Sequence, residues 1–137
     1  MTCIFCAIAA GDVPAHRVHE DDKTFAFLDI NPLARGHALV IPKVHVAKLE
    51  DAPPEHAAAL MHTVQKLIPA LCGATQCEDV TVAINNGPDA GQEVQHLHVH
   101  VIPRQRGDAA GPIHALFSKR PTPDANDLAA LAAKVAA

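Results

Sequence analysis

The chain has 137 residues, which is the size of one ordinary domain and too short for two. It contains no Trp or Tyr and only 4 Phe, so it lacks the aromatic platforms on which proteins stack single-stranded bases. Its 11 Lys and Arg against 15 Asp and Glu give a formal net charge of −4, which disfavours nucleic acid as a partner. The unusual counts are 10 His and 4 Cys, because imidazole serves metal ligation and proton or phosphoryl transfer near neutral pH.

The start of the chain has neither the basic nor the apolar region of a signal peptide, and no later stretch is long and apolar enough to span a bilayer. We therefore expect a cytoplasmic protein that does not contact membranes. Thiols stay reduced in that compartment, so the pair Cys3-x-x-Cys6 suggests metal or redox use before a structural disulfide.

The N-terminal third predicts three strands. Residues 18–21 and 24–28 are separated by a short polar segment, which is typical of a hairpin. Residues 37–41 are expected to form a third strand that Pro42 ends, because proline cannot donate a hydrogen bond to a sheet. Residues 29–36 form the loop between the second and third strands.

A long helix follows. It is expected to open at Pro53 and Pro54, with Glu55 in its first turn, and to end at Gly73. The apolar residues at helical spacing are Leu60, Val64, Leu67 and Leu71. This pattern predicts a helix with one buried face.

The next segments predict two more strands. In residues 80–84, large apolar side chains alternate with Thr81 and Ala83, and residues 95–102 form another alternating strand that Pro103 ends. Residues 85–91 form a turn-rich loop between them. Residues 104–121 are expected to be irregular.

A C-terminal helix is expected to begin with Thr122 as its N-cap and Pro123 at its first helical position. Leu128, Leu131 and Val135 lie on one face of that helix. Hairpin strands without a strand–helix–strand rhythm predict an α+β fold. We expect an antiparallel sheet of about five strands, one long helix and a C-terminal helix.

The segment after residue 95 alternates histidines with apolar residues. The histidines are His96, His98 and His100, and the apolar residues are Leu97, Val99 and Val101. Side chains on a strand alternate between faces, so three imidazoles share one surface at intervals of roughly 6.6 Å. A half-exposed strand whose polar positions happen to be His is the alternative, and we favour a functional face.

Two chemistries fit such a face. A catalytic metal could be held by two or three imidazoles, with a carboxylate or water nearby. Alternatively, one imidazole attacks phosphorus while its neighbours donate hydrogen bonds to the phosphate. The preceding loop contains Gly87 and Gly91 and can present backbone N–H groups to an anion, although alone it is more typical of an ordinary tight hairpin. Loop and histidines together favour phosphate chemistry.

Residues 91–104, with the sequence GQEVQHLHVHVIPR, resemble the signature of the histidine-triad (HIT) family of nucleotide hydrolases and transferases. Three upstream segments also resemble that family, namely residues 4–8, 27–32 and 36–45. The resemblance implies one HIT-like domain over residues 1–137. Its motif-bearing core covers about residues 3–104, and residues 105–137 form a C-terminal tail and helix.

The resemblance also implies roles in catalysis. His98 would attack the α-phosphate of a purine nucleotide derivative and form a covalent nucleotidyl-histidine, which water then cleaves. His100 would contact the phosphate, and Gln92 would lie beside the α-phosphate and the leaving group. His96 completes the triad. The expected substrate is an adenosine phosphoramidate or a dinucleoside polyphosphate.

The resemblance further implies a nucleotide-binding pocket. Asp29 would accept hydrogen bonds from the ribose hydroxyls, and a loop cap is the alternative role for this carboxylate. The apolar residues of the set would form a slot for the base, although each of them fits a hydrophobic core equally well. The implied nucleotide-binding residues are Ile4, Phe5, Phe27, Asp29, Ile30, Asn85, Gly91, Gln92, Glu93, Val94, His98 and His100.

Some bacterial HIT proteins carry a zinc site of two Cys and two His, which implies the ligands Cys3, Cys6, His45 and His96. Four protein ligands close the zinc shell, so this zinc would be structural and no catalytic metal is required. Two buried thiols near a frayed terminus are the alternative for the Cys pair. His37 matches a family histidine near the site, and a role at the start of a strand fits it nearly as well.

Glu93 departs from the family pattern. The Hint branch has Ser at this position and the Fhit branch has Thr, and a carboxylate there could repel an anionic leaving group. Two other functional classes stay open, namely a purine-nucleotide binding or signalling module and a metallohydrolase that uses the triad as zinc ligands. The resemblance also implies a homodimer.

Overall fold

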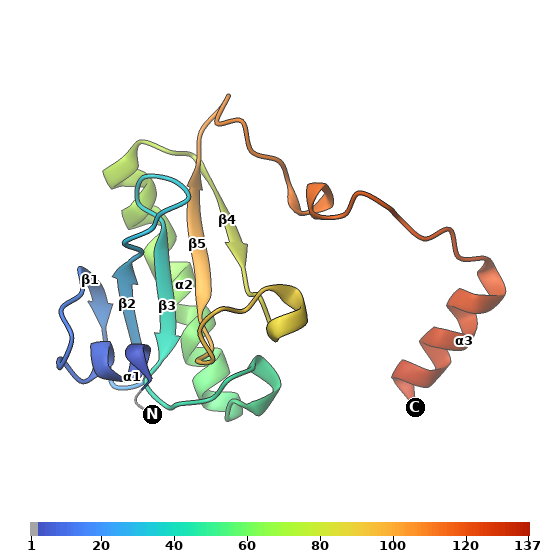
Figure 1. Cartoon of the computed structure of the whole chain (residues 1–137), viewed down its shortest axis with the longest axis horizontal. Helices are drawn as coiled ribbons and strands as arrows, with labels where there is room; N and C mark the ends of the chain where they lie inside the picture. The colour runs from blue at the N-terminus through green and yellow to red at the C-terminus, as the bar shows by residue number, and fades with distance from the viewer. Residues whose placement is uncertain (1–2) are drawn as a thin grey trace.

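The computed structural model describes residues 3–137. One antiparallel sheet has the strand order β1-β2-β3-β5-β4 (Figure 1). Its strands are β1 (Arg17–Glu20), β2 (Thr24–Leu28), β3 (Ala38–Pro42), β4 (Asp79–Ala83) and β5 (Val99–Arg104). The helices are α1 (Ile4–Ala9), α2 (Pro54–Thr75) and α3 (Ala125–Ala136). The predicted α+β class, with five strands, a long helix and a C-terminal helix, is confirmed.

Helix α2 covers one face of the sheet (Figure 1). Its residues Leu60, Val64, Leu67 and Leu71 are buried, as their spacing predicted. They share one hydrophobic cluster with small and branched residues of the strands and of the segment that precedes β5: Ala26, Ala38, Val40, Leu97, Val99 and Val101. The histidine strand is therefore backed by the main core.

The short helix α1 packs against the other face of the sheet. Phe5 and Ile8 from this helix form a second cluster with side chains from β2 and β3, namely Phe25, Phe27, Leu39 and Ile41. Sequence reasoning did not predict α1. The spacing of Ile4, Phe5 and Ile8, three and four residues apart, is the signal that could have found it.

Several predicted boundaries were wrong. Helix α2 continues through Gly73 to Thr75, and Gln76 ends it in a left-handed conformation with φ 58° while its N–H bonds to the Cys72 carbonyl. Helix α3 begins at Ala125, not at Pro123. The side chain of Asp124 is the N-cap because its carboxylate accepts the Asp127 N–H at 2.8 Å.

The histidine segment also joins the sheet later than predicted. Strand β5 begins at Val99, because the Leu97 N–H donates to the Val46 carbonyl at 2.8 Å in the loop after β3. The strand then runs through Pro103 to Arg104. Proline is tolerated there because β3 pairs with β5 only as far as Val101, which leaves Pro103 a neighbour on one side alone. Alternation survives, since residues 97, 99 and 101 face α2.

Beyond β5 the chain leaves the sheet as a C-terminal arm, residues 105–137, that carries α3 at its far end (Figure 1). Each residue of this arm is exposed. Within the part of the chain that the structure covers, no helix has the length and apolar character needed to cross a membrane.

Candidate active site

A pocket of about 480 Å³ opens beside α1, on the side of the sheet away from α2. It brings together the predicted nucleotide-binding residues from five separate segments, with one exception. Those lining it are Ile4, Phe5, Phe27, Asp29, Ile30, Asn85, Gly91, Glu93, Val94, His98 and His100. Apolar side chains at one end and imidazoles at the other suit a ligand with an apolar ring and a charged group.

Gln92 is the exception. Its side chain is buried, and Oε1 accepts the Gly87 N–H at 2.8 Å. Nε2 donates to the carbonyls of Ala47 and Val94 at 2.7 and 3.0 Å. Gln92 therefore holds the glycine loop from behind in this structure, and its expected contact with the α-phosphate stays a prediction.

Sequence reasoning missed part of the wall. Ile8 and Val13 line the pocket because α1 and the following turn fold against β2, and Leu39 reaches it from β3. Leu33 lines it from the loop before β3, as does His37, which sequence reasoning had placed near the site. The spacing of apolar residues in α1 is the local sequence signal that could have predicted the contribution of this helix to the pocket wall.

The hydrogen bonds of His98 define its protonated nitrogen. Nδ1 lies 2.8 Å from the backbone carbonyl of His96, and a carbonyl can only accept, so Nδ1 carries the proton. In the neutral ring Nε2 then holds a lone pair. His98 is 8% exposed and lines the pocket. This arrangement presents an imidazole nucleophile to the pocket.

His100 has the opposite tautomer. The Leu33 N–H donates to Nδ1 of His37 at 3.0 Å, so the neutral His37 ring carries its proton on Nε2. That Nε2 lies 2.9 Å from Nδ1 of His100, which must accept. The proton of His100 is consequently on Nε2, a buried atom with no hydrogen-bond partner among residues 3–137. Nε2–H of His100 is therefore a hydrogen-bond donor that is available to a ligand.

Burial keeps these two rings neutral. It lowers the pKa of His100 to about 4, and the neighbouring His98 and His37 rings act in the same direction. Burial also lowers the pKa of His37, while the carboxylate of Asp29 opposes part of that effect. Neutral rings are what the tautomer assignment requires near pH 7.

Asp29 caps its loop and also lines the pocket. Oδ1 accepts the Asn31 N–H at 2.9 Å, which is a local loop cap. Oδ2 lies 3.8 Å from Nε2 of His37. The two roles considered for this carboxylate are compatible, since one oxygen caps the loop while Asp29 still lines the pocket.

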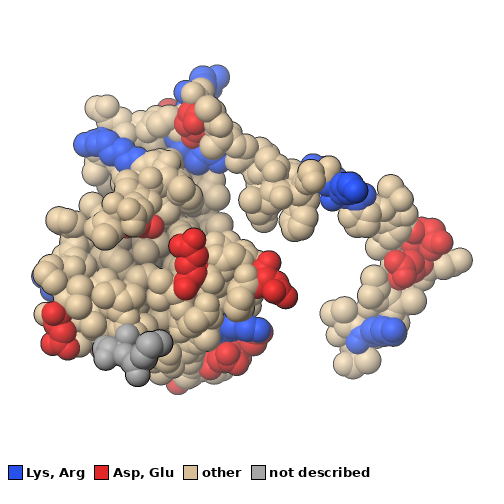
Figure 2. All heavy atoms as spheres, viewed as in Figure 1, with Lys and Arg blue, Asp and Glu red and all other residues tan. Residues whose placement is uncertain are grey.

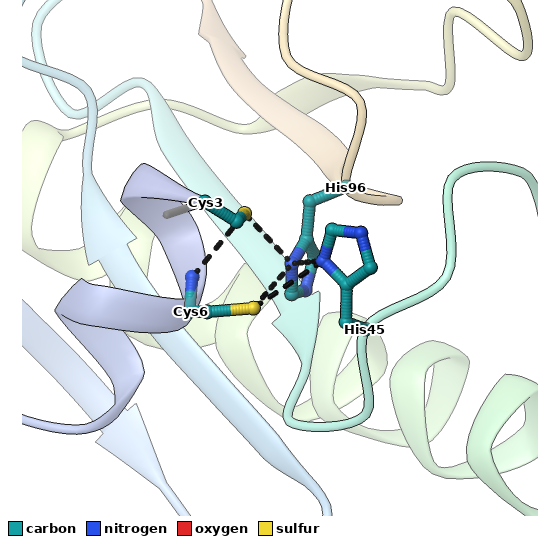
Figure 3. Close-up of side chains that lie close together, drawn as sticks. All are labelled: Cys3, Cys6, His45 and His96. Atoms are coloured by element: carbon teal, nitrogen blue, oxygen red, sulfur yellow. Dashed lines mark hydrogen bonds between the residues drawn. The ribbon is translucent and has the colours of Figure 1, made fainter. Parts of the chain in front are cut away.

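The four predicted zinc ligands lie close together (Figure 3). Nδ1 of His96 lies 3.4 Å from Sγ of Cys3 and 3.5 Å from Sγ of Cys6. Nδ1 of His45 lies 3.3 Å from Sγ of Cys6 and 3.2 Å from Nδ1 of His96. A tetrahedral zinc with ordinary bond lengths separates S from N by about 3.6 Å and N from N by about 3.4 Å. The cluster fits that ion.

One further hydrogen bond supports this fit. Nε2 of His96 donates to the Pro42 carbonyl at 2.8 Å, which leaves Nδ1 unprotonated and aimed at the thiols. Burial raises the pKa of the Cys6 thiol, and Cys3 raises it further. A divalent cation would displace those thiol protons. His96 therefore belongs to the metal cluster, whereas His98 and His100 belong to the pocket.

Residues 10–107 match the model of the HIT domain family, so the chain belongs to this family. It is 44% identical over 121 residues to an uncharacterized HIT-like protein of Mycobacterium tuberculosis, covering 88% of this chain and 83% of that one. It is 43% identical over 103 residues to an adenosine 5'-monophosphoramidase of Saccharomyces cerevisiae, covering 75% and 63%. An adenylylsulfatase of Arabidopsis thaliana is 42% identical over 106 residues, covering 77% and 54%.

Solved structures agree with the fold. A Streptococcus mutans protein is 38% identical with a TM-score of 0.88, and the match covers 98% of this chain and 83% of that one. A zinc-bound histidine triad family protein of Mycobacterium smegmatis is 40% identical with a TM-score of 0.76, covering 99% and 96%.

Proposed function

We propose that this protein hydrolyses a purine nucleotide derivative at its α-phosphate, with His98 as the nucleophile. The observation that carries the proposal is the pair of opposite tautomers in one pocket. His98 presents a lone pair on Nε2, and His100 presents an N–H donor. An attacking nitrogen next to a donor for phosphate oxygens is the arrangement that phosphoryl transfer needs.

The reaction has two displacements. In the first, Nε2 of His98 forms a bond to the α-phosphorus, the bond from phosphorus to the leaving group breaks, and the leaving group takes up a proton from solvent. In the second, water forms a bond to phosphorus and releases a proton to solvent, the bond to Nε2 breaks, and a nucleoside monophosphate is released. Nδ1 of His98 keeps its proton throughout and donates it in a hydrogen bond to the His96 carbonyl, which holds the ring in place. Nε2–H of His100 donates to a phosphate oxygen in both steps.

Adenosine 5'-phosphoramidate is the substrate that we favour. Relatives named adenosine 5'-monophosphoramidase and adenylylsulfatase both act on an adenosine nucleotide, by their names. Glu93 lines the pocket beside Gly91 and Val94. A carboxylate at this position repels a sulfate or polyphosphate leaving group but tolerates a neutral amine.

The substrate proposal has a direct test. Wild type and Glu93→Gln are compared on adenosine 5'-phosphoramidate and on a diadenosine polyphosphate, with Asp89→Asn as a control for loss of one nearby charge. We expect Glu93→Gln to raise kcat/KM for the polyphosphate relative to the phosphoramidate. An unchanged ratio would contradict the role of Glu93.

The catalytic proposal is tested with His98→Ala, alongside His16→Ala as an exposed control. We expect His98→Ala to abolish turnover and to retain nucleotide binding, and His16→Ala to behave as wild type. Turnover by the His98 variant equal to that of wild type would refute the mechanism. A pure binding or signalling module predicts that the partner interactions of the protein survive this substitution.

The third functional class is a metallohydrolase. The separation of His96 from the other two histidines argues against one metal held by the whole triad. Turnover after gentle removal of metal, with folding followed by circular dichroism, separates the classes. Retained turnover at saturating substrate excludes a catalytic metal, and complete loss at saturating substrate in a folded protein would favour it.

We further propose that Cys3, Cys6, His45 and His96 bind one structural zinc. When bound, zinc supplies a cross-link between the N-terminus, the loop after β3 and the histidine segment. Two thiolates and two imidazoles fill its four positions. Elemental analysis is expected to find about one zinc per chain. Absence of zinc from protein prepared with zinc available would refute the site.

We also propose that the chain is a homodimer in which the C-terminal arms are exchanged. Six apolar side chains of the arm are 51–84% exposed, namely Ile113, Leu116, Phe117, Leu128, Leu131 and Val135. Helix α3 has 12 residues, and a helix of this length is marginal without tertiary packing. The surface of the arm in Figure 2 is largely uncharged between a few charged positions. The arm therefore requires a partner surface.

A second copy supplies that surface. A groove of about 620 Å³ runs along α2 beside β4, which is an edge strand, and its lining is mainly apolar: Ala58, Met61, His62, Val64, Gln65, Ile68 and Val82. The match to the Streptococcus mutans structure covers 98% of the chain, so it includes the arm. Reciprocal exchange about a two-fold axis gives each arm the same groove and closes the assembly.

Sedimentation of the full chain and of residues 1–107 tests this exchange. We expect a dimer for the full chain and a monomer for the shortened one. Leu131→Lys is expected to weaken the dimer, and Lys134→Ala, one turn away, is expected to leave it intact. A monomeric full chain at all concentrations would contradict the proposal.

A further inference from the structure

The metal cluster and the nucleophile share one residue. Nδ1 of His96 faces the thiols of Cys3 and Cys6, and Nε2 is fixed on the Pro42 carbonyl. The backbone carbonyl of His96 accepts the Nδ1 proton of His98 at 2.8 Å. A shift of the His96 backbone therefore moves the acceptor that orients the attacking ring.

Helix α1 provides a second connection between the metal ligands and the nucleophile. Cys3 and Cys6 flank Phe5 in the sequence, and the Phe5 ring packs edge-on against His96 and His98, with centroids 6.0 and 5.1 Å away. The same ring packs on Phe27, with a centroid distance of 5.5 Å. Phe5 is thus a wall of the nucleotide pocket and a contact of the nucleophile.

The loop that carries His45 contacts the histidine segment through its backbone. His45 is followed by Val46, whose carbonyl accepts the Leu97 N–H at 2.8 Å. Leu97 lies between His96 and His98 in the chain. The four ligands therefore come from three segments, each of which touches the peptide that carries the nucleophile.

Helix α1 has only six residues, so it has little stability of its own. Side-chain packing of Phe5 and Ile8 holds it against the sheet. Zinc binding by Cys3 and Cys6 would tie both ends of its first turn to the histidine segment. Without that tie, the packing of Phe5 and Ile8 is what holds α1 and the pocket wall in place.

We propose that zinc binding and nucleotide binding are coupled in this protein. Zinc on the four ligands holds the Phe5 wall and the His96 carbonyl in the positions that receive nucleotide. By linkage, bound nucleotide raises the affinity for zinc by the same factor. The proposal rests on the nucleotide pocket proposed above and adds a regulatory role for the metal, since loss of zinc would weaken nucleotide binding in a chain that stays folded.

The main test measures, in wild type, the effect of zinc on nucleotide affinity and the effect of nucleotide on zinc affinity. Calorimetry gives the Kd of adenosine 5'-monophosphate for the zinc-loaded and the zinc-free protein, and chelator competition gives the zinc Kd with and without that nucleotide. We expect both ratios to be equal and on the order of 5- to 150-fold. Equal nucleotide affinity of the two forms would overturn the proposal.

Hydrogen exchange provides a readout that does not need nucleotide. Zinc removal is expected to speed amide exchange in residues 4–9 and 96–98 and to leave α2 unchanged. Unchanged exchange in the first two segments would overturn the coupling. If the nucleotide binds neither form, the proposed function fails, and the exchange result still decides whether zinc holds these segments.

Variants separate the effect of the metal on nucleotide binding from the effect of Phe5 packing. Cys6→Ser is expected to lose zinc and to bind nucleotide as weakly as zinc-free wild type, while Cys72→Ser, outside the cluster, retains both properties. Phe5→Leu is expected to keep one zinc per chain but to shrink the ratio between the two nucleotide affinities. A full wild-type ratio in Phe5→Leu would refute the route through Phe5.

Discussion

Replacing His37 with Phe removes the donor that fixes the tautomer of His100. In wild type Nε2 of His37 lies 2.9 Å from Nδ1 of His100, and His37 is 2% exposed, so water does not readily replace this bond. Leaving a buried polar group without its partner costs about 1–3 kcal/mol. If that cost falls on the phosphate contact, kcat/KM drops roughly 5- to 150-fold.

His37→Gln separates the lost donor from the lost ring. The amide of Gln can still donate to Nδ1 of His100, so we expect it to recover part of kcat/KM, with His16→Ala as the exposed control. Nitrogen NMR of the ring is expected to show a proton on Nε2 of His100 in wild type and a mixture of tautomers in His37→Phe. Wild-type kcat/KM in His37→Phe, with a similar melting temperature, would refute the role of His37.

Two further predictions concern stability. Burial lowers the pKa of His100 to about 4, from about 6.5 for an unperturbed imidazole, so the unfolded chain binds a proton at this site over that range and the folded chain does not. Thermal unfolding is therefore expected to show stability falling as the pH is lowered from about 6.5 to about 4, with a weaker dependence in His100→Gln; the same slope in both would contradict this. Gly36 has φ +87°, and a Cβ there would lie 2.5 Å from Cγ2 of Thr75, whereas Gly11 has φ +84° and nothing within 4 Å. Gly36→Ala is expected to destabilise the fold by about 1–3 kcal/mol more than the matched Gly11→Ala, as measured by denaturant unfolding, and equal losses would show that the contact with Thr75 is unimportant.

The segment with three histidines was predictable because the alternation of its side chains between two faces depends only on neighbouring residues. Alternation placed Leu97 and Val99 against α2, and their histidine neighbours on the other face, before any contact was known. Cys3 and Cys6 could be proposed as metal ligands from their spacing together with the family resemblance, and the structure brings them together with His45 and His96. The ends of helices were less predictable, since Gln76 rather than Gly73 terminates α2 through a bond that depends on the whole last turn.

Other features depend on contacts between distant segments. The role of His37 follows from its bonds to Leu33 and His100, and the second of these is 63 positions away in sequence. Gln92 matched a family position beside the phosphate, but its amide is occupied by three backbone groups that only the folded loop brings near. Residue type and spacing do not encode such pairings.

The central claim is that His98 forms a bond to the α-phosphorus during turnover. The most direct measurement is mass spectrometry of protein mixed with adenosine 5'-phosphoramidate, quenched under alkaline conditions and digested. We expect an adenylyl group on the peptide that contains His98, formed and consumed at rates compatible with kcat, and absent in His98→Ala. Continued turnover with no adduct at any time, or an adduct on another residue, would contradict it.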